Sequence, residues 1–410
     1  MKRNYPSFIE AFMEYTQHVG APDKFIRWSA IAGIAACLER RTWVKHKKTQ
    51  TIYPNMYVML TAESGIARKS TATRPIMDLI ADIPEINKLS TQMSTAALIT
   101  QLQEAGREKK FIYEGEEYHN SSVFSYSSEA AATIGESKVL GDIQVLLTDF
   151  YDGGSPAEWS KNTNWSKTLI GTGRQSVYNP CLNILYCSTP TWLENAIGKN
   201  GIEGGFASRF IFVNQLEAYD SDLDWKEEED ITIDISKMKR KLTEDMQLMC
   251  KIQGEYKVAT GFGAVYNSIV RDIKIKSSTA GIMSSYYSRK LWHLIKLSQI
   301  LTADKSNDLV ILPETLEQAN QMLLELEPEM YKPFKSANFK LDNVEMVNMV
   351  WKFAQKRKRV SKKELLRAVW GKMSAKQLDE AIQTLVTLGK FQFDVGYMPI
   401  GYLIADATDL

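Results

Sequence analysis

Three residues that could bind phosphate, Lys69, Ser70 and Thr71, stand after a turn of small residues and before a helical pattern. In a phosphate-binding loop, backbone N–H groups and a helix start face the anion, a lysine reaches the terminal phosphates and a hydroxyl binds Mg²⁺. The standard pattern G-x-x-x-x-G-K-[ST] has glycines where this chain carries Glu63 and Arg68. The stretch is therefore either a nucleotide site with altered chemistry or an ordinary strand–turn–helix.

Different residues of the turn favour different ones of these two interpretations. Gly65 and Ala67 are small enough for a tight turn, whereas a side chain at Arg68 is tolerable only if that residue keeps a negative φ angle. Ser70 is the expected Mg²⁺ ligand. The expected ATP-binding residues are Ser64, Gly65, Ile66, Ala67, Arg68, Lys69, Ser70 and Thr71.

Further polar residues follow predicted strands in the order that an ATPase requires. Glu129 is a candidate acid for polarising an attacking water, and Thr189 can sense a terminal phosphate. Arg209 follows a glycine-rich loop and is the candidate cation offered to a neighbouring subunit. Arg289, at a helix start, is the candidate cation of a helical lid. Each residue alone also fits a structural role, as a solvated acid or a surface cation, and only their order favours catalysis.

Alternating strands and helices must position these residues. The apolar runs MYVMLTA, SVFSYSSE, CLNILYCST and RFIFVNQL predict strands between helical segments, which favours an α/β layer with a mostly parallel sheet. Residues 4–44 predict two helices, with Ser7 and Asp23 as N-caps. The segment SRKLWHLIKLSQILTA is the strongest amphipathic pattern within residues 234–332.

Near the C-terminus, residues 351–376 hold ten Lys or Arg residues against a single acid, which is typical of a surface that neutralises phosphates. The helix that follows carries Asp379 and Glu380, so we expect contacts to the DNA backbone without strong base readout. Trp351 and Trp370 are predicted core residues. The alternative is a solvated charged face on a module that contacts protein. The expected DNA-binding residues are Lys356, Arg357, Lys358, Arg359, Lys362 and Lys363.

Composition narrows the classes further. The 410 residues include 50 Lys or Arg and 49 Asp or Glu, a net charge of +1, so nucleic-acid contacts must come from local clusters. The four cysteines and four histidines lack zinc-ligand spacing, which predicts reduced thiols. We expect no signal peptide, and the most apolar run, WSAIAGIAACL, is about half the length of a membrane span. A cytoplasmic protein without membrane contact follows.

Together these stretches resemble the phage-, prophage- and plasmid-encoded P-loop ATPases described as replicative helicases or primase-helicase C-terminal parts, related to the AAA+ and superfamily 3 type. The similar stretches lie between residue 21 and about residue 303. In that family the loop often has R-K-[ST/G], so Arg68 is similar to a family variant. The stretches are APDKFIRWSAIAGIAACLERR, YPNMYVMLTAESGIARKST, YSSEA, LLTDFYDG, NPCLNILYCSTPTWL, GGFASRFIFV and SRKLWHLIKLSQIL.

The resemblance implies an AAA+/RecA-like P-loop core with a helical N-terminal part and a helical lid. The last 70 residues predict three helices and then two strands, KFQFDV and PIGYLIA, which is the order of a winged helix. Ser128 stands where an Asp usually supports the metal, and either Asp149 or Asp152 compensates or belongs to a structural turn. The implied roles are phosphate and Mg²⁺ binding for Lys69 and Ser70, catalytic acid for Glu129, sensor for Thr189, finger for Arg209 and lid cation for Arg289.

The expected regions are an N-terminal helical region (1–50), a P-loop ATPase core (51–230), a helical lid (231–335) and a winged-helix domain (340–410). We expect an ATP-dependent DNA helicase or translocase, ring-shaped and hexameric, that replicates a phage or mobile element in the bacterial cytoplasm. One alternative is a nucleotide-dependent DNA-binding or helicase-loading protein with little turnover. A packaging motor ranks lower, since no nuclease-like acidic cluster follows residue 230.

Overall fold

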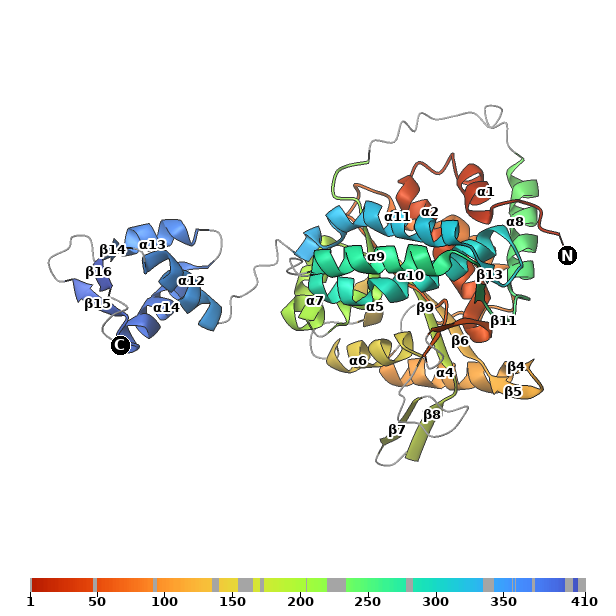
Figure 1. Cartoon of the computed structure of the whole chain (residues 1–410), viewed down its shortest axis with the longest axis horizontal. Helices are drawn as coiled ribbons and strands as arrows, with labels where there is room; N and C mark the ends of the chain where they lie inside the picture. The colour runs from red at the N-terminus through yellow and green to blue at the C-terminus, as the bar shows by residue number, and fades with distance from the viewer. Residues whose placement is uncertain are drawn as a thin grey trace. The chain divides into compact units, whose positions relative to one another are not determined.

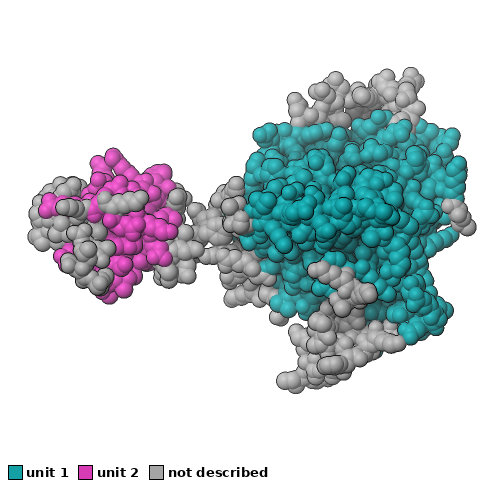
Figure 2. Space-filling model, in the orientation of Figure 1, with its two compact units in different colours: residues 1–334 teal, residues 335–410 magenta. Residues whose placement is uncertain are grey.

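The chain forms two compact units, residues 1–334 and 335–410 (Figure 2). The regions expected at 1–50 and 51–230 lie in the first unit, and so does the region 231–335 apart from its last residue. The structure is a computed structural model, and it describes residues 2–46, 50–90, 94–134, 140–153, 165–169, 173–203, 205–219, 234–277, 283–334, 343–355, 357, 359–370, 373–394 and 401–404.

A four-stranded parallel sheet forms the centre of the first unit, with the strand order β10-β3-β9-β6. These are the four strands expected from the apolar runs, and the α/β class with a parallel sheet is confirmed. Every residue of β3, β9 and β10 is buried, as is usual for parallel strands covered on both faces. The strands are β3 (Tyr57–Thr61), β6 (Ser121–Ser127), β9 (Pro180–Ser188) and β10 (Phe210–Asn214).

The register gives the sheet two distinct edges. Tyr57, which begins β3, pairs with Phe210, which begins β10. Thr61, which ends β3, pairs with Ser188 of β9 and Asn214 of β10. We call the edge at Thr61 the carboxyl edge and the edge at Tyr57 the amino edge.

Helices surround this sheet. Helix α2 contacts β3, β9 and β10, while α9, α10 and α11 lie side by side as a layer (Figure 1). The helices of this unit are α1 (Phe8–Tyr15), α2 (Asp23–Leu38), α3 (Lys69–Ala81), α4 (Thr95–Glu108), α5 (Ala130–Ile134), α6 (Leu140–Tyr151), α7 (Pro190–Glu203), α8 (Ile235–Met249), α9 (Phe262–Ser277), α10 (Ser284–Lys305) and α11 (Pro313–Met330).

The N-terminal helices pack closely because their contact residues are small. Ser7 caps α1 as expected, since its side chain accepts from the Glu10 amide. Asp23, in contrast, is the first helical residue of α2 and not its cap, which is Pro22. A Cβ atom at Gly33 would approach the Ile76 side chain to 2.6 Å, so glycine allows α2 and α3 to meet there.

Helix α10 differs from the amphipathic helix that its sequence predicts. Lys290, His293 and Lys296 are all buried, at 2%, 0% and 3% exposure. The polar side chains therefore form interior contacts instead of a solvated face, because the helix is covered on several sides by other elements.

Smaller β elements lie around the main sheet. The β4–β5 hairpin turns at Glu114 and Gly115, whose φ angles of 50° and 81° are those of a type I′ turn. The strands are β1 (Thr42–His46), β2 (Gln50–Ile52) and β11 (Gly254–Glu255) in one sheet, and the pairs β4 (Lys110–Tyr113) with β5 (Glu116–His119), β7 (Trp165–Leu169) with β8 (Gly173–Val177), and β12 (Lys257–Val258) with β13 (Val310–Ile311).

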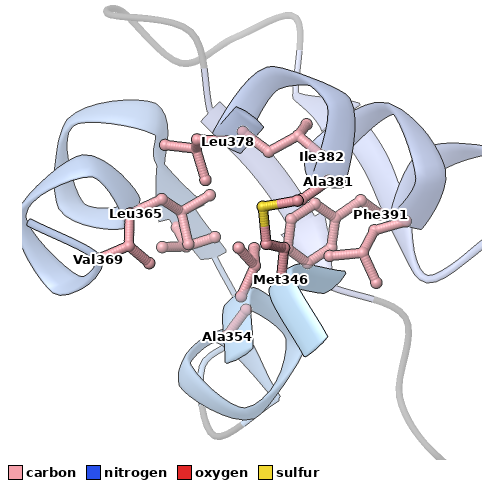
Figure 3. Close-up of a cluster of buried hydrophobic side chains, with 11 residues drawn as sticks. Met346, Ala354, Leu365, Val369, Leu378, Ala381, Ile382 and Phe391 are labelled. Carbon is pink, nitrogen blue, oxygen red and sulfur yellow. The ribbon is translucent and has the colours of Figure 1, made fainter. Parts of the chain in front are cut away.

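The second unit has its own hydrophobic core, formed by eleven buried residues that include Leu365, Leu378 and Phe391 (Figure 3). Trp351 packs against this core, but Trp370 is 85% exposed, so its expected burial is wrong. The elements are α12 (Asn343–Ala354), β14 (Arg359–Ser361), α13 (Lys362–Ala368), α14 (Ala375–Thr387), β15 (Phe391–Asp394) and β16 (Gly401–Ile404), with the strand order β14-β16-β15.

Two bulk expectations are answered directly. All four cysteines are free and buried. Within the described ranges, no helix combines the length and the apolar character needed to cross a membrane.

Candidate functional site

The loop of residues 62–68 lies at the carboxyl edge, where ligands of open parallel sheets usually bind. It leaves β3 after Thr61 and enters α3 at Lys69. The Ala62 amide donates to the Ser188 carbonyl over 3.3 Å, which ties the start of the loop to β9. The first amides of α3 have no side-chain cap, so they are available to an anion.

The backbone of this loop is strained at one residue. Arg68 has φ 45° and ψ 45°, the left-handed conformation, so the expectation of a negative φ is wrong. An arginine there costs about 1–2 kcal/mol relative to a right-handed residue, and such strain clusters at functional sites. Gly65 has φ 83°, and a Cβ atom added to it would meet nothing within 4 Å. The loop thus keeps the backbone of a glycine position while carrying a cation there.

Lys69 lies over the same loop. Its Nζ donates to the Ala62 carbonyl over 2.5 Å and to the Glu63 carbonyl over 3.4 Å. Burial lowers the pKa of Lys69, while the nearby carboxylates of Glu129 and Glu63 act to raise it. The ammonium group is therefore held at the loop mouth, close to the candidate acid.

Glu129 and Thr189 join this site from the ends of β6 and β9. Glu129 is exposed, and its backbone amide donates to the Ser127 hydroxyl over 3.3 Å. We expected this acid at the end of a strand next to β3. In the structure, β9 lies between β3 and β6, the strand that precedes Glu129. The Thr189 hydroxyl accepts from the Trp192 amide over 3.3 Å at the start of α7. Ser128 is exposed beside Glu129.

A small pocket extends this site toward the N-terminal helices. It has a volume of about 230 Å³ and is lined by Tyr15 and His18 on one side and by Thr71 and Arg74 on the other. Thr71, in the first turn of α3, is the lining residue that lies nearest to the loop in the sequence.

The expected finger residue lies at the opposite edge of the sheet. Arg209 directly precedes β10, so it is separated from the loop by the strand, about 16 Å for five residues. Its side chain is only 6% exposed and pairs with Asp152 over 2.5 Å. It also donates to the Gly205 carbonyl, while its Nε has no hydrogen-bond partner among the described residues.

Arg289 pairs with the other oxygen of the same carboxylate. The distance from its Nη1 to Asp152 Oδ1 is 3.0 Å, and its side chain is 24% exposed. Arg289 thus lies at the amino edge, not over the chain's own loop as expected for a lid cation. Asp149 is close to this cluster, where burial raises its pKa against the opposing charge of Arg209. The geometry does not support Asp149 or Asp152 as ligands of an Mg²⁺ ion held by Ser70.

Sequence reasoning missed a buried network beneath these arginines. The His293 Nε2–H donates to the Ser208 carbonyl, and its Nδ1 accepts from the Tyr151 hydroxyl. The Lys296 ammonium donates to Asn55 Oδ1 and lies 4.3 Å from the Tyr151 ring centre. Burial lowers the pKa of His293 to about 3 and that of Lys296 to about 7.

A spacing signal for this network is present in the sequence. Arg289, His293 and Lys296 follow one another at intervals of four and three residues, which places them on one face of α10. Because apolar residues alternate with them in the sequence, these three residues have the pattern of the solvated side of an amphipathic helix. That pattern hid their interior position.

In the second unit, the expected DNA-binding residues are only partly described. Arg357, Arg359 and Lys363 are exposed, and Lys362 pairs with Asp379 over 2.6 Å. Lys356 and Lys358 lie outside the described residues.

Among the described residues, no group of three or more His, Cys, Asp or Glu side chains could hold a metal ion. No protein-family model matches this sequence, and no curated protein matches it.

Proposed function

We propose that this protein is an ATP-dependent motor that moves along or unwinds DNA during replication of a phage or mobile element. The observation that carries the proposal is the left-handed backbone of Arg68 directly before Lys69 at the carboxyl edge. That backbone turns successive N–H groups toward one point, where phosphate would be bound. The resemblance of the sequence to replicative P-loop ATPases is consistent with it.

In this proposal, each polar residue at the carboxyl edge has one role. Lys69 would neutralise the terminal phosphates of ATP, and the Ser70 hydroxyl would hold Mg²⁺, which supplies charge neutralisation when bound. Glu129 would accept the proton of the attacking water, and Thr189 would position the terminal phosphate. The pocket beside Thr71 would take the base.

The amino edge supports a ring-shaped assembly. Arg209 and Arg289 pair with Asp152 at the edge of the sheet opposite the chain's own loop, so in this proposal they contact ATP that is bound to another copy. A closed ring supplies that contact to every subunit, because each interface repeats the previous one. A hexamer is the oligomer proposed here.

The second unit supports the assignment of DNA as the track. Its order of elements, a helix, a strand, two helices and two strands, is compatible with the proposed winged helix, and Arg357, Arg359 and Lys363 are exposed on it. Trp370, also exposed, is a surface on which a base can stack.

A second candidate is a nucleotide-dependent DNA-binding or helicase-loading protein with little turnover. The observation in its favour is the exposed Ser128, because a serine and not a second carboxylate directly precedes Glu129.

ATP hydrolysis by the full chain, measured with and without single-stranded DNA, separates the two candidates. A motor should hydrolyse ATP and do so faster with DNA, and Lys69→Ala should abolish that activity. ATP binding without turnover under both conditions would favour the loading protein. Turnover that survives Lys69→Ala would contradict both proposals for the loop.

A further inference from the structure

A second pocket, unrelated to the loop, lies between the β1 sheet and the β4–β5 hairpin. Its volume is about 280 Å³, below the usual range for drug-sized ligands, so it suits one small ligand unit. Five of its ten lining residues are aromatic. Such a density of rings around an open pocket needs an explanation beyond packing, since most of these rings remain partly exposed.

Strand alternation explains how the rings reach one place. On β1, Trp43 and Lys45 are two residues apart and point to the same side. On β4, Phe111 and Tyr113 share a side in the same way, and Tyr118 lies opposite Phe111 on β5. Two separate β elements thus direct alternate residues into one pocket.

The rings meet in two pairs. Phe111 and Tyr118 are stacked, with centroids 5.4 Å apart and planes inclined by 17°. Trp43 and Tyr113 meet edge to face at 4.6 Å. Phe111, Tyr113 and Tyr118 are only half-buried, which leaves ring surface for a flat ligand.

The charged residues of the pocket show where a polar group of the ligand could lie. Arg40 is 6% exposed, lies 4.0 Å from the Tyr53 ring centre and donates to two backbone carbonyls, and no described carboxylate lies within ion-pair distance of it. Lys45 is half-exposed and pairs with Glu255 over 3.3 Å, a carboxylate that it shares with a second lysine. Glu114 is the one acid in the lining. With Glu255 beside Lys45, two carboxylates balance the two cations, and Lys45 is the exposed cation of the lining. A negatively charged group can therefore lie beside Lys45, while the rings favour a flat ligand.

We propose that this pocket binds one nucleotide of a single-stranded nucleic acid, with the base against the rings of Tyr113 and Tyr118 and the phosphate near Lys45. Aromatic side chains beside a cation are the usual means of holding a single strand, because every base has a face that can stack. The site is separate from the basic residues of the second unit, and it does not depend on ATP hydrolysis.

The test is binding of a fluorescent oligothymidylate to the full chain, measured by anisotropy at fixed salt. Tyr113→Ala and Tyr118→Ala should each weaken binding about 5- to 150-fold, the range for removal of one stacking ring. Ile112→Ala is the matched control, since Ile112 lies on the same hairpin, points to the other side and is 67% exposed. Tyr118→Phe keeps the ring and should retain affinity. Thermal melts check that every variant is folded.

Further measurements locate the binding site on the chain and show whether its ligand is a strand or a free nucleotide. An oligonucleotide with 5-iododeoxyuridine should cross-link to peptides that contain Trp43, Phe111, Tyr113 or Tyr118, and Lys45→Gln should reduce the log–log salt slope by about 0.7. Thymidine monophosphate should compete far more weakly than the strand. Equal competition would assign the site to free nucleotides and overturn the strand proposal.

Unchanged oligonucleotide affinity in both tyrosine variants, or cross-links confined to residues 335–410, would also overturn it. The measurements need no ATP and can be repeated with Lys69→Ala. Failure of the pocket therefore remains distinguishable from failure of the proposed motor.

Discussion

The two edges of the central sheet differ in whether their cations already have a carboxylate partner from the same chain. At the carboxyl edge, Glu129 and Ser70 are exposed, Arg68 is strained, and a Cβ atom at Gly65 would meet nothing. At the amino edge, Asp152 accepts from two arginines that come from distant parts of the chain. The carboxyl edge can therefore receive an anion from outside the chain, whereas at the amino edge the carboxylate of Asp152 is the anion.

The physical reason is the cost of burying charge. The guanidinium of Arg209 is nearly buried, and a buried charge is strongly unfavourable unless a counter-charge or hydrogen bonds accompany it. Asp152 supplies that counter-charge. In the proposed function, a phosphate from a neighbouring copy would replace the carboxylate, since Asp152 and Arg289 remain partly exposed. The proposed finger arginine would then be held against an acid of its own chain until that phosphate arrives.

The largest expected effect tests whether the amino edge serves another copy. Arg209→Ala should lower ATP turnover by about three to five orders of magnitude, as trans arginines do in related phosphoryl transfer. Mixing Arg209→Ala subunits with Lys69→Ala subunits should restore part of the activity, because some interfaces then hold one intact half of each kind. Turnover is measured across mixing ratios.

The matched control is Asp152→Asn, which keeps both arginines and removes only the stored carboxylate charge. It should reduce stability and leave turnover within about tenfold of the original, since the residue does not contact ATP in this proposal. No recovery at any mixing ratio, in assemblies of unchanged mass, would contradict a shared site.

The next effect tests the carboxyl edge as the place of chemistry. Glu129→Gln should keep ATP binding and lose about two to four orders of magnitude in hydrolysis, because the amide cannot accept the proton of the water. Calorimetry checks the binding and phosphate release checks the turnover. Normal hydrolysis in this variant would move the catalytic base elsewhere.

Substitution of Lys69 tests whether the carboxyl edge binds phosphate. Lys69→Ala should weaken ATP binding about 10- to 150-fold, the value of a hydrogen bond between charged groups. Lys88→Ala is a suitable control, because Lys88 also donates to two backbone carbonyls and burial also lowers its pKa, but it lies beyond the far end of α3. Equal losses in the two variants, measured by calorimetry, would mean that the effect is structural.

The burial of Lys296 near the amino edge should make the free energy of unfolding depend on pH. The pKa of Lys296 is about 7 in the folded chain, below its ordinary value of 10.5, so the unfolded chain binds more protons between these values. Its contribution to the free energy of unfolding therefore rises with pH in that window, by about 1.4 kcal/mol per unit at most, and is flat well below pH 7.

Lys296→Met is the variant that isolates this term. Urea unfolding at pH 6 and pH 8.5 should show the original chain gaining about 2 kcal/mol relative to the variant across that interval. A stability difference that does not change between the two pH values would refute the depressed pKa.

The smallest effect concerns the strained loop. Arg68→Gly should stabilise the fold by up to about 1 kcal/mol, because the left-handed cost disappears while the unfolded chain gains some freedom. Arg74→Gly, in the exposed interior of α3, should instead destabilise it by about 1 kcal/mol. Thermal unfolding of both variants would decide the matter, and the same sign in both would show that Arg68 is not strained.

The sequence by itself determined the four strands of the sheet, the cap at Ser7 and a helix after the loop, although this helix already begins at Lys69 and includes the Lys-Ser-Thr run expected before it. These features are local, because a buried parallel strand is a continuous apolar run, and a cap or helix start depends on a few consecutive residues. The elements of the second unit were visible for the same reason, apart from the short strand β14.

Only the tertiary structure decided which side chains meet. Asp152 is 57 residues from Arg209 and 137 from Arg289, and no local pattern relates residues so far apart. Burial was equally invisible: Lys296 lies inside and Trp370 outside, against what each residue type alone suggests. The left-handed backbone of Arg68 belongs here too, since its cost is borne only when the sheet and α3 hold both ends of the loop in place.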